Sequence, residues 1–356
     1  MQDLSSSAQS DAFSVGIVGA SGFTGTELLR LLAGHPQLQV KVATGASKAG
    51  TRVAELYPSL AAAYPAMTYD SYDAAQLDGL DLIFCGLPHG VSMTVIPELR
   101  SRVGHIVDLG SDFRLHDPAL YPEWYGAEHA MPTLLDDFVY GLPEFFRSEL
   151  EGAELIAATG CNAATSVFAL APLLQAGLIQ PHGLIADIVT GVSGAGRPPK
   201  ENTTFCSVDS DVTAYGLLRH RHTPEIEQAL EDFTGLNTSV LFTPHLAPLN
   251  RGIIATCYGR PARDGVTTAD ALDAMHAAYD DEPFVVVLDG SPSVKATLGA
   301  NTVHVTARAD PRTGLVMGIA VLDNLMKGAS GMAVQNANLA LGIEETLGLP
   351  IVGVYP

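Results

Sequence analysis

The stretch GIVGASGFTGTELL, residues 16–29, decides the fold class of this chain. It places glycines at Gly16, Gly19, Gly22 and Gly25 between a strand-like run and a helix-like run. The order is GxxGxxG, whereas the usual dinucleotide fingerprint is GxGxxG. The glycines still permit a tight turn and let backbone N–H groups approach a pyrophosphate at the positive end of the helix. The position at the first strand–helix junction favours a dinucleotide site, and a plain tight turn is the alternative.

Strand-like and helix-like runs alternate outward from this turn. Residues 13–20 predict a short buried strand, and residues 24–35 predict an amphipathic helix that ends at Gly34. This rhythm continues along the first half of the chain and is typical of an α/β fold, a Rossmann-like doubly wound parallel sheet. The further strands are predicted over 40–46, 80–90, 103–113 and 153–160, with helical stretches such as 92–101 between them.

The second half of the chain has fewer helical runs between its strands. Such a pattern predicts a mixed or antiparallel sheet and hence a second, α+β domain. We expect a disordered tail over 1–12, a first domain over 13–160 and a second domain over 161–328, followed by a helical segment within 329–356. The predicted strands of the second domain are 182–196, 239–248, 251–261, 284–290, 301–310 and 314–324.

Composition narrows the classes of partner. The formal net charge is −20 over 356 residues, which argues against nucleic acid or an anionic membrane, because both require a basic surface. The N-terminus lacks the pattern of a signal peptide, and no apolar run reaches the roughly 20 residues of a membrane span. The four cysteines are widely spaced and form no metal-binding pattern. We therefore expect a cytoplasmic protein without disulfides or a metal site.

The residues after the second predicted strand indicate which dinucleotide is bound. NAD-binding chains usually carry an acidic residue about 20 residues after the glycine turn, where it binds the ribose hydroxyls. This chain has Thr44, Ser47, Lys48 and Arg52 at that place and no carboxylate before Glu55. Hydroxyls and cations suit a 2′-phosphate, so we infer NADP(H). The alternative is that the two cations are solvated surface charges.

Cys161 follows an apolar run and Gly160, and it precedes a helix-like pattern. A helix N-terminus places partial positive charge beside a thiol, which lowers its pKa and makes it nucleophilic. The alternative is a small buried core residue, a role that suits Cys85 and Cys257 better because both lie inside strand-like runs. Cys206 has no assigned role.

A thiol enzyme also needs a proton donor or acceptor. His220, Arg221 and His222 stand together before a helix-like pattern in an acidic chain, and their alternative role is a helix start capped by Thr223. The stretch TGVSGAGRPP, residues 190–199, resembles a second phosphate-binding loop, with a plain hairpin turn as its alternative. Further candidate cations for a substrate anion are Arg114, Arg197 and Arg251.

Nine motifs together resemble the N-acetyl-γ-glutamyl-phosphate reductases, which belong to the semialdehyde dehydrogenase superfamily. The resemblance covers nearly the whole chain, and nine motifs in the expected order are highly specific. It implies a Rossmann domain for NADPH that is completed by the C-terminal helix within 329–356, and a second domain for catalysis and dimerisation. The motifs are GASGFTG (19–25), GLPHGVS (86–92), VDLGSDFRL (107–115), YGLPE (140–144), GC (160–161), SGAGR (193–197), HRHTPEI (220–226), FTPHLAPLNRGI (242–253) and DNLMKGASGMAVQNAN (323–338).

The resemblance also implies roles for particular residues. It implies that Cys161 is the nucleophile and that His222 is the general acid/base, with His220 as the alternative. A homodimer or homotetramer is implied as well. The resemblance implies cofactor contacts, and Ser47, Lys48 and Arg52 were inferred above from the sequence itself. The complete cofactor-binding set is Gly19, Ala20, Ser21, Gly22, Phe23, Thr24, Gly25, Ser47, Lys48, Arg52, Leu87, Pro88, His89, Ser193, Gly194, Ala195, Asn324 and Gln335. Independently of the resemblance, the cations expected to bind the substrate are Arg114, Arg197 and Arg221.

The implied reaction is the NADPH-dependent reduction of a small acyl-phosphate substrate through a thioester on Cys161, in arginine biosynthesis. The chain departs from the family in two places. TGCNAA (159–164) replaces the usual PGCYPT and resembles a lysine-pathway relative that reduces a carrier-protein-bound aminoadipyl phosphate, and Ser207 stands where arginine-pathway enzymes tend to carry Glu. That relative is one alternative; an NADP-binding sensor with an inert cysteine and a thiol acyltransferase are two others.

Overall fold

The computed structural model describes residues 12–355, so nearly all of the predicted tail over 1–12 lies outside the described residues. The first part of the chain forms a six-stranded sheet in the order β2-β1-β3-β4-β6-β5, and every pair of neighbours is parallel. The predicted fold class is confirmed. The strands are β1 (Phe13–Val18), β2 (Leu38–Ala43), β3 (Leu82–Cys85), β4 (His105–Asp108), β5 (Val139–Gly141) and β6 (Leu155–Ala158).

Helices cover both faces of this sheet, because successive strand residues point to opposite faces. Leu82 and Phe84 of β3 join the core under α1 (Phe23–Leu32) and α10 (Gly331–Ala340). Ile83 and Cys85 join the core under α3 (Ser92–Leu99) on the other face. β3 is buried on both faces, which explains why its sequence is continuously apolar. The other helices of this part are α2 (Val53–Leu56), α4 (Leu120–Tyr125) and α5 (Pro143–Leu150).

The strand order turns at β1, because β2 lies on one side of it and β3 on the other. Ligands of such sheets bind in the crevice at the carboxyl ends of the strands at this switch point. Gly19 follows β1 with φ +88°, and a Cβ there would lie 2.4 Å from the carbonyl oxygen of Gly86. A Cβ on Gly25 would lie 2.4 Å from Cα of Ala20. The two glycines therefore allow the tight turn and the close packing of α1 against β1.

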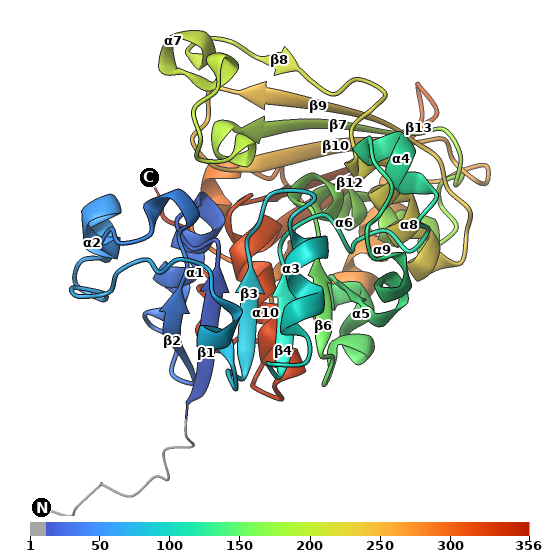
Figure 1. The fold of residues 1–356 in the computed structure, drawn as a ribbon. Coiled ribbons are helices and arrows are strands. Elements are labelled where there is room, and N and C mark those ends of the chain that lie inside the picture. The colour runs from blue at the N-terminus through green and yellow to red at the C-terminus, as the bar shows by residue number, and fades with distance from the viewer. Residues whose placement is uncertain (1–11, 356) are drawn as a thin grey trace, which may run out of the picture.

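The second sheet is seven-stranded and mixed, in the order β11-β12-β13-β10-β7-β9-β8. The β7–β9 and β11–β12 pairs are parallel and the other pairs antiparallel. This sheet lies across the carboxyl ends of the first one (Figure 1). The predicted mixed sheet is confirmed, although the short β8 was not predicted. The strands are β7 (Leu184–Gly191), β8 (Thr213–Ala214), β9 (Val240–Ala247), β10 (Ile253–Gly259), β11 (Val285–Val287), β12 (Val303–Asp310) and β13 (Leu315–Leu322).

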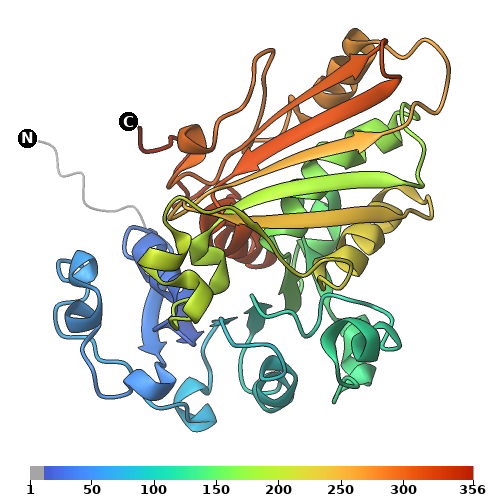
Figure 2. The same cartoon turned by 90° about the horizontal axis from the view of Figure 1, so that it is seen from above.

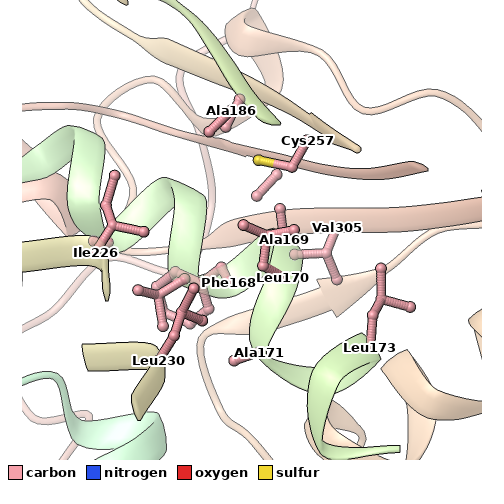
Figure 3. Packing of buried hydrophobic residues seen from close by; sticks show 14 of the residues in the cluster. Phe168, Ala169, Leu170, Ala171, Leu173, Ala186, Ile226, Leu230, Cys257 and Val305 are labelled. Carbon is pink, nitrogen blue, oxygen red and sulfur yellow. The ribbon is translucent and has the colours of Figure 1, made fainter. Parts of the chain in front are cut away.

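Helix α6 (Cys161–Gln175) packs between the second sheet and its other helices, α8 (His222–Thr234) and α9 (Thr268–Tyr279). Every residue from Asn162 to Leu174 is buried, and a helix that is apolar all round is stable only in such a core. Figure 3 shows its Phe168 and Leu170 near Ile226 and Leu230 of α8. This packing fixes the position of Cys161, the first residue of α6.

The chain returns to the first sheet after β13. A short π-helix, Met326–Ser330, leads into α10, which contacts β4, β6 and α5. The remaining short helix, α7 (Phe205–Val208), belongs to the loop between β7 and β8. Seen from above, this yellow-green loop lies over the blue first strands (Figure 2). Segments from both sheets therefore meet above the glycine turn.

Candidate active site

A cavity of about 1310 Å³ lies where the two sheets meet. It exceeds the roughly 300–1,000 Å³ of a site for one drug-sized ligand, so a dinucleotide and a small substrate fit together. Its walls come from the carboxyl ends of β1 and β3, the start of α6, the loop after β7, the start of α8 and the segment after β13. One space thus joins the glycine turn to Cys161.

Most residues that the sequence predicted for the site line this cavity. The catalytic candidates Cys161, His220 and His222 do so, and so do the substrate candidates Arg114, Arg197 and Arg221. The cofactor candidates in the lining are Gly19, Ser21, Gly22, Phe23, Thr24, Ser47, Leu87, Pro88, Ser193, Gly194, Ala195 and Asn324. Those outside the lining are Ala20, Gly25, Lys48, Arg52, His89 and Gln335.

The candidates outside the lining have other contacts. Ala20 and Gly25 pack against each other within the turn. His89 is bonded through Nδ1 to Oδ1 of Asp112 at 2.6 Å. Gln335 is buried, and its amide donates to Glu144 and Glu345 at 3.0 and 2.8 Å. Geometry gives no support for a direct cofactor contact by His89 or Gln335.

The start of α1 is suited to a phosphate group. Gly22 is the N-cap residue and no side chain caps the first turn, which carries no acidic residue. Gly22, Phe23 and Thr24 line the cavity, and uncapped N–H groups with the positive end of the helix dipole attract an anion. At Gly19 the backbone of Gly86 leaves no room for a side chain. These residues fit the pyrophosphate of a dinucleotide.

Cys161 is the first residue of α6, behind the N-cap Gly160, as the sequence predicted. The expectation that its pKa is lowered was wrong: burial raises the pKa of the thiol to about 11, although the Arg114 charge and the Asn162 N–H partly offset burial. The field at a helix end is local and modest, whereas desolvation acts on the whole thiolate. The thiol is therefore protonated near neutral pH and needs a base.

His222 lies directly beside the start of α6. A Cβ on Gly160 would be 2.5 Å from Nε2 of His222, so no side chain fits between them. Burial holds the pKa of His222 well below its usual value, and the charges of Arg114 and Arg221 and the neighbouring His220 ring also disfavour a second positive charge there. Burial is the main cause of this lowered pKa. The imidazole is neutral, so it can accept a proton, and its Nδ1 has no partner in the described residues.

His220 supports His222. Its Nδ1 accepts the backbone N–H of His222 at 3.1 Å, and its ring lies 4.6 Å from the His222 ring. Burial, and next the Arg221 charge, lower the pKa of His220 to about 4. The ring also contacts Tyr215 and Phe242 edge-on. Both histidines are thus neutral in a largely apolar wall.

Glu225 was missed by the sequence analysis and is central to the site. It is fully buried on α8, one turn after His222, and its Oε2 lies 3.9 Å from Nε2 of that residue. It accepts hydrogen bonds from the Gly160 N–H at 2.7 Å and the Tyr140 hydroxyl at 3.0 Å. The carboxylate therefore ties α8 to the start of α6. The i, i+3 spacing within HTPEI was the available signal, because it puts both side chains on one face of a helix.

The four candidate arginines differ in whether their charge is already paired: Arg114 and Arg251 have partners, and the other two have none in the described residues. Arg114 is buried and fully used: it donates to the carbonyl oxygens of Ala158 and Leu109 at 2.8 and 3.0 Å and lies 3.4 Å from Glu225. It therefore supplies a fixed charge beside Cys161. Arg251 does not line the cavity, because it pairs with Glu27 and Asp323. Arg197 and Arg221 line the cavity and make no ion pair within residues 12–355.

Asn162 and Tyr215 form a further pair in the wall. The Asn162 amide donates to the Tyr215 hydroxyl at 3.3 Å, and its Oδ1 lies 3.8 Å from the Cys161 sulfur. Burial raises the pKa of Tyr215 to about 12, so the phenol is neutral. In the described part of the chain no cluster of His, Cys, Asp or Glu could hold a metal ion, and no helix is long and apolar enough to cross a membrane.

Comparisons with known proteins agree with this geometry. Residues 14–153 match the family described as "Semialdehyde dehydrogenase, NAD binding domain", and residues 161–324 match "Semialdehyde dehydrogenase, dimerisation domain". Proteins named N-acetyl-gamma-glutamyl-phosphate reductase from Jannaschia sp. (strain CCS1) and Paracoccus denitrificans (strain Pd 1222) are 46% and 45% identical to this chain. They align with 96% of it and with 99% and 98% of their own lengths.

Solved structures share the fold at low identity. Aspartate semialdehyde dehydrogenase II from Vibrio cholerae has a TM-score of 0.69 and 17% identity, covering 94% of this chain and 99% of its own. Aspartate semialdehyde dehydrogenase with NADP from Candida albicans has a TM-score of 0.67 and 14% identity, covering 93% and 100%. These likenesses concern the arrangement of the two sheets.

Proposed function

Because this chain belongs to the N-acetyl-gamma-glutamyl-phosphate reductase family of semialdehyde dehydrogenases, we propose that it reduces N-acetyl-L-glutamyl 5-phosphate to N-acetyl-L-glutamate 5-semialdehyde and phosphate with NADPH. The observation that carries the proposal is the single cavity, which joins the glycine turn at Gly19 to Cys161 and the neutral His222. The relatives' names support the acetylated substrate of arginine biosynthesis over the carrier-bound one.

The Cys161 thiol is the nucleophile in this mechanism. Its proton passes to His222, because a thiol with a pKa of about 11 is protonated and the imidazole is neutral. Glu225, 3.9 Å away, stabilises the imidazolium. The thiolate attacks the acyl carbon, phosphate leaves and a thioester forms on Cys161, which divides one difficult step into two easier ones.

The remaining residues stabilise charge during reduction. Backbone N–H groups at the start of α6 face the developing oxyanion of the tetrahedral species. NADPH, when bound, supplies hydride to the thioester carbonyl. His222 then manages the proton as the thiohemiacetal collapses to the aldehyde and the Cys161 thiol. Arg221, which is free of ion pairs in the described residues, binds an anionic group of the substrate, and Arg114 keeps its charge beside the sulfur.

The proposed assembly is a homodimer, formed through the open face of the second sheet. Helices α6, α8 and α9 cover one face of that sheet. Strand register aligns Leu241, Ile185, Tyr258 and Met317 across the other face, and all four are at least partly exposed. An apolar row of this kind is typical of a protein interface. We further propose the cytoplasm, where a reducing environment keeps a catalytic thiol free.

The test is the reverse reaction, followed as NADP reduction with phosphate and each semialdehyde in turn. We expect turnover with N-acetyl-glutamate 5-semialdehyde, and turnover only with the carrier-bound aminoadipate semialdehyde would select the lysine-pathway alternative. Cys161→Ser should bind NADPH but lose most turnover, because a hydroxyl is a poor nucleophile at neutral pH. Retention of more than a tenth of wild-type activity would refute the nucleophile. NADP binding without turnover in the wild type, unchanged in Cys161→Ser, would indicate a sensor, and acylation of Cys161 without NADP reduction would indicate an acyltransferase.

A further inference from the structure

The ribose end of the cavity lacks the cations that the sequence placed there. Ser47 lines the cavity beside Gly45 and Ala46, but Lys48 and Arg52 do not. Lys48 ends the short 3-10 turn Ala46–Lys48 after β2 and is half-buried, and Arg52 is exposed. Among residues 44–54 no carboxylate takes the place of these cations. A 2′-phosphate bound here needs a positive charge from another part of the chain.

Arg197 from the second domain reaches this end of the cavity. Its guanidinium carbon lies 5.9 Å from the centre of the Tyr57 ring, within the range of a cation–π contact. The Tyr57 hydroxyl donates to the carbonyl of Ser21 at 2.9 Å, and the Ser21 hydroxyl donates to the carbonyl of Gly45 at 3.1 Å. Three contacts thus connect Arg197 to the glycine turn and to the end of β2.

A buried tyrosine supports the same placement. Tyr69 packs against Gly45: a Cβ added to Gly45 would lie 2.6 Å from the Cβ of Tyr69. Burial raises the pKa of Tyr69 to about 12, and the Arg197 charge counteracts this. The Tyr69 hydroxyl has no hydrogen-bond partner in the described residues. Arg197 is therefore close to both tyrosines that back the end of β2.

Arg197 is free to bind an anion, and its loop is held by hydrogen bonds at Ser193. Its side chain makes no hydrogen bond or ion pair within residues 12–355. In the preceding loop, the Ser193 N–H donates to the carbonyl of Asn250 at 3.3 Å and the Asn324 amide donates to the Ser193 hydroxyl at 3.0 Å. Gly196 then turns with φ +85°, and Pro198 and Pro199 follow. The loop that carries the guanidinium is thus hydrogen-bonded at Ser193 to two other segments of the second domain.

We propose that Arg197, a residue of the second domain, binds the 2′-phosphate of NADP(H) and sets the preference of this chain for NADP over NAD. The inference rests on the proposed function, because it deepens the choice of cofactor. A guanidinium suits this task, since it donates two parallel hydrogen bonds to a phosphate. Ser47 lines the same cavity and supplies a hydroxyl there. The nucleotide-binding domain then supplies the cradle, and the second domain supplies the discriminating charge.

The experiment measures the binding of 2′,5′-ADP and 5′-AMP by calorimetry, because these fragments differ only in the 2′-phosphate. The proteins are the wild type, Arg197→Ala, Arg197→Lys, Lys48→Ala and Arg52→Ala. Arg312→Ala, which removes an equally charged residue from an exposed hairpin, is the matched control. Circular dichroism melting checks that each variant is folded. The readout is the dissociation constant for 5′-AMP divided by that for 2′,5′-ADP. This ratio measures the preference for the 2′-phosphate and does not depend on turnover.

In Arg197→Ala we expect this ratio to fall by about 10- to 100-fold, the range of a charge-assisted hydrogen bond, and in Arg197→Lys by less. The control, Lys48→Ala and Arg52→Ala should keep the wild-type ratio within about twofold. If the ratio is unchanged in Arg197→Ala, or if it falls instead in Lys48→Ala or Arg52→Ala, the proposal is overturned. The preference of the wild type for NADP then still stands. A wild type that binds both fragments equally overturns it together with the NADP assignment.

Discussion

Replacing Glu225 with glutamine removes one negative charge from the centre of the site while keeping the side chain's shape. Its Oε2 lies 3.9 Å from Nε2 of His222. At an effective dielectric constant of about 20, two unit charges at that distance interact by about 4 kcal/mol. The imidazolium loses this stabilisation when the proton moves from Cys161, so we expect kcat to fall by about 10³-fold.

The same substitution should make the cysteine more reactive. The Glu225 charge raises the pKa of Cys161, and the Arg114 charge lowers it. Without the carboxylate only the lowering charge remains, so the pKa of Cys161 falls and more thiolate is present at pH 7. Alkylation of Cys161 by iodoacetamide should therefore become faster while turnover becomes slower.

The assays are steady-state NADP reduction and the rate of alkylation at pH 7, with Glu231→Gln on the exposed side of α8 as the matched control. Loss of Glu225 also leaves Arg114 buried without its partner, which costs about 3–5 kcal/mol of stability. Both assays therefore need a temperature at which circular dichroism shows a folded protein. Unchanged kcat, or alkylation that slows in parallel with turnover, would refute this account of Glu225.

Three further predictions concern neighbouring features. His222→Asn should lower kcat by about 10²–10⁴-fold with cofactor affinity nearly unchanged, whereas His220→Asn should act mainly through KM; the reverse pattern would exchange their roles. Alkylation of wild-type Cys161 should keep rising from pH 6 to pH 10, because its pKa is about 11 and the thiolate fraction grows as pH approaches that value; a plateau near pH 7 would contradict this. Leu241→Glu should give a monomer in light scattering because it charges the open sheet face, while Leu236→Glu, in the loop before β9, should leave the mass of the wild type.

The fold could be predicted where the sequence pattern is local. Buried parallel strands such as β3 are continuously apolar, and the glycines at 19 and 25 mark the turn at the switch point. The strands β5 and β8 were missed because they have only three and two residues, too few to show a period. Their pairing depends on neighbours that are distant in sequence.

The site was predictable only in part, for a related reason. The position of Cys161 at a helix start is visible in sequence, but its pKa depends on burial by α8 and the π-helix, where a Cβ on Gly328 would lie 2.8 Å from the Cys161 Cβ. Glu225 gains its importance only because α8 docks on the start of α6. Arg197 of the second domain likewise lies over the Tyr57 ring of the first one. Such contacts are set by tertiary packing, which a motif does not encode.

The central claim is that Cys161 carries the acyl group. The most direct measurement is intact-protein and peptide mass spectrometry of the wild-type enzyme mixed with N-acetyl-L-glutamyl 5-phosphate in the absence of NADPH. The account predicts one acyl group per chain, attached as a thioester to the peptide that contains Cys161, and its disappearance when NADPH is added. An enzyme that oxidises NADPH with this substrate but never shows the adduct, or shows it on another residue, would contradict the claim.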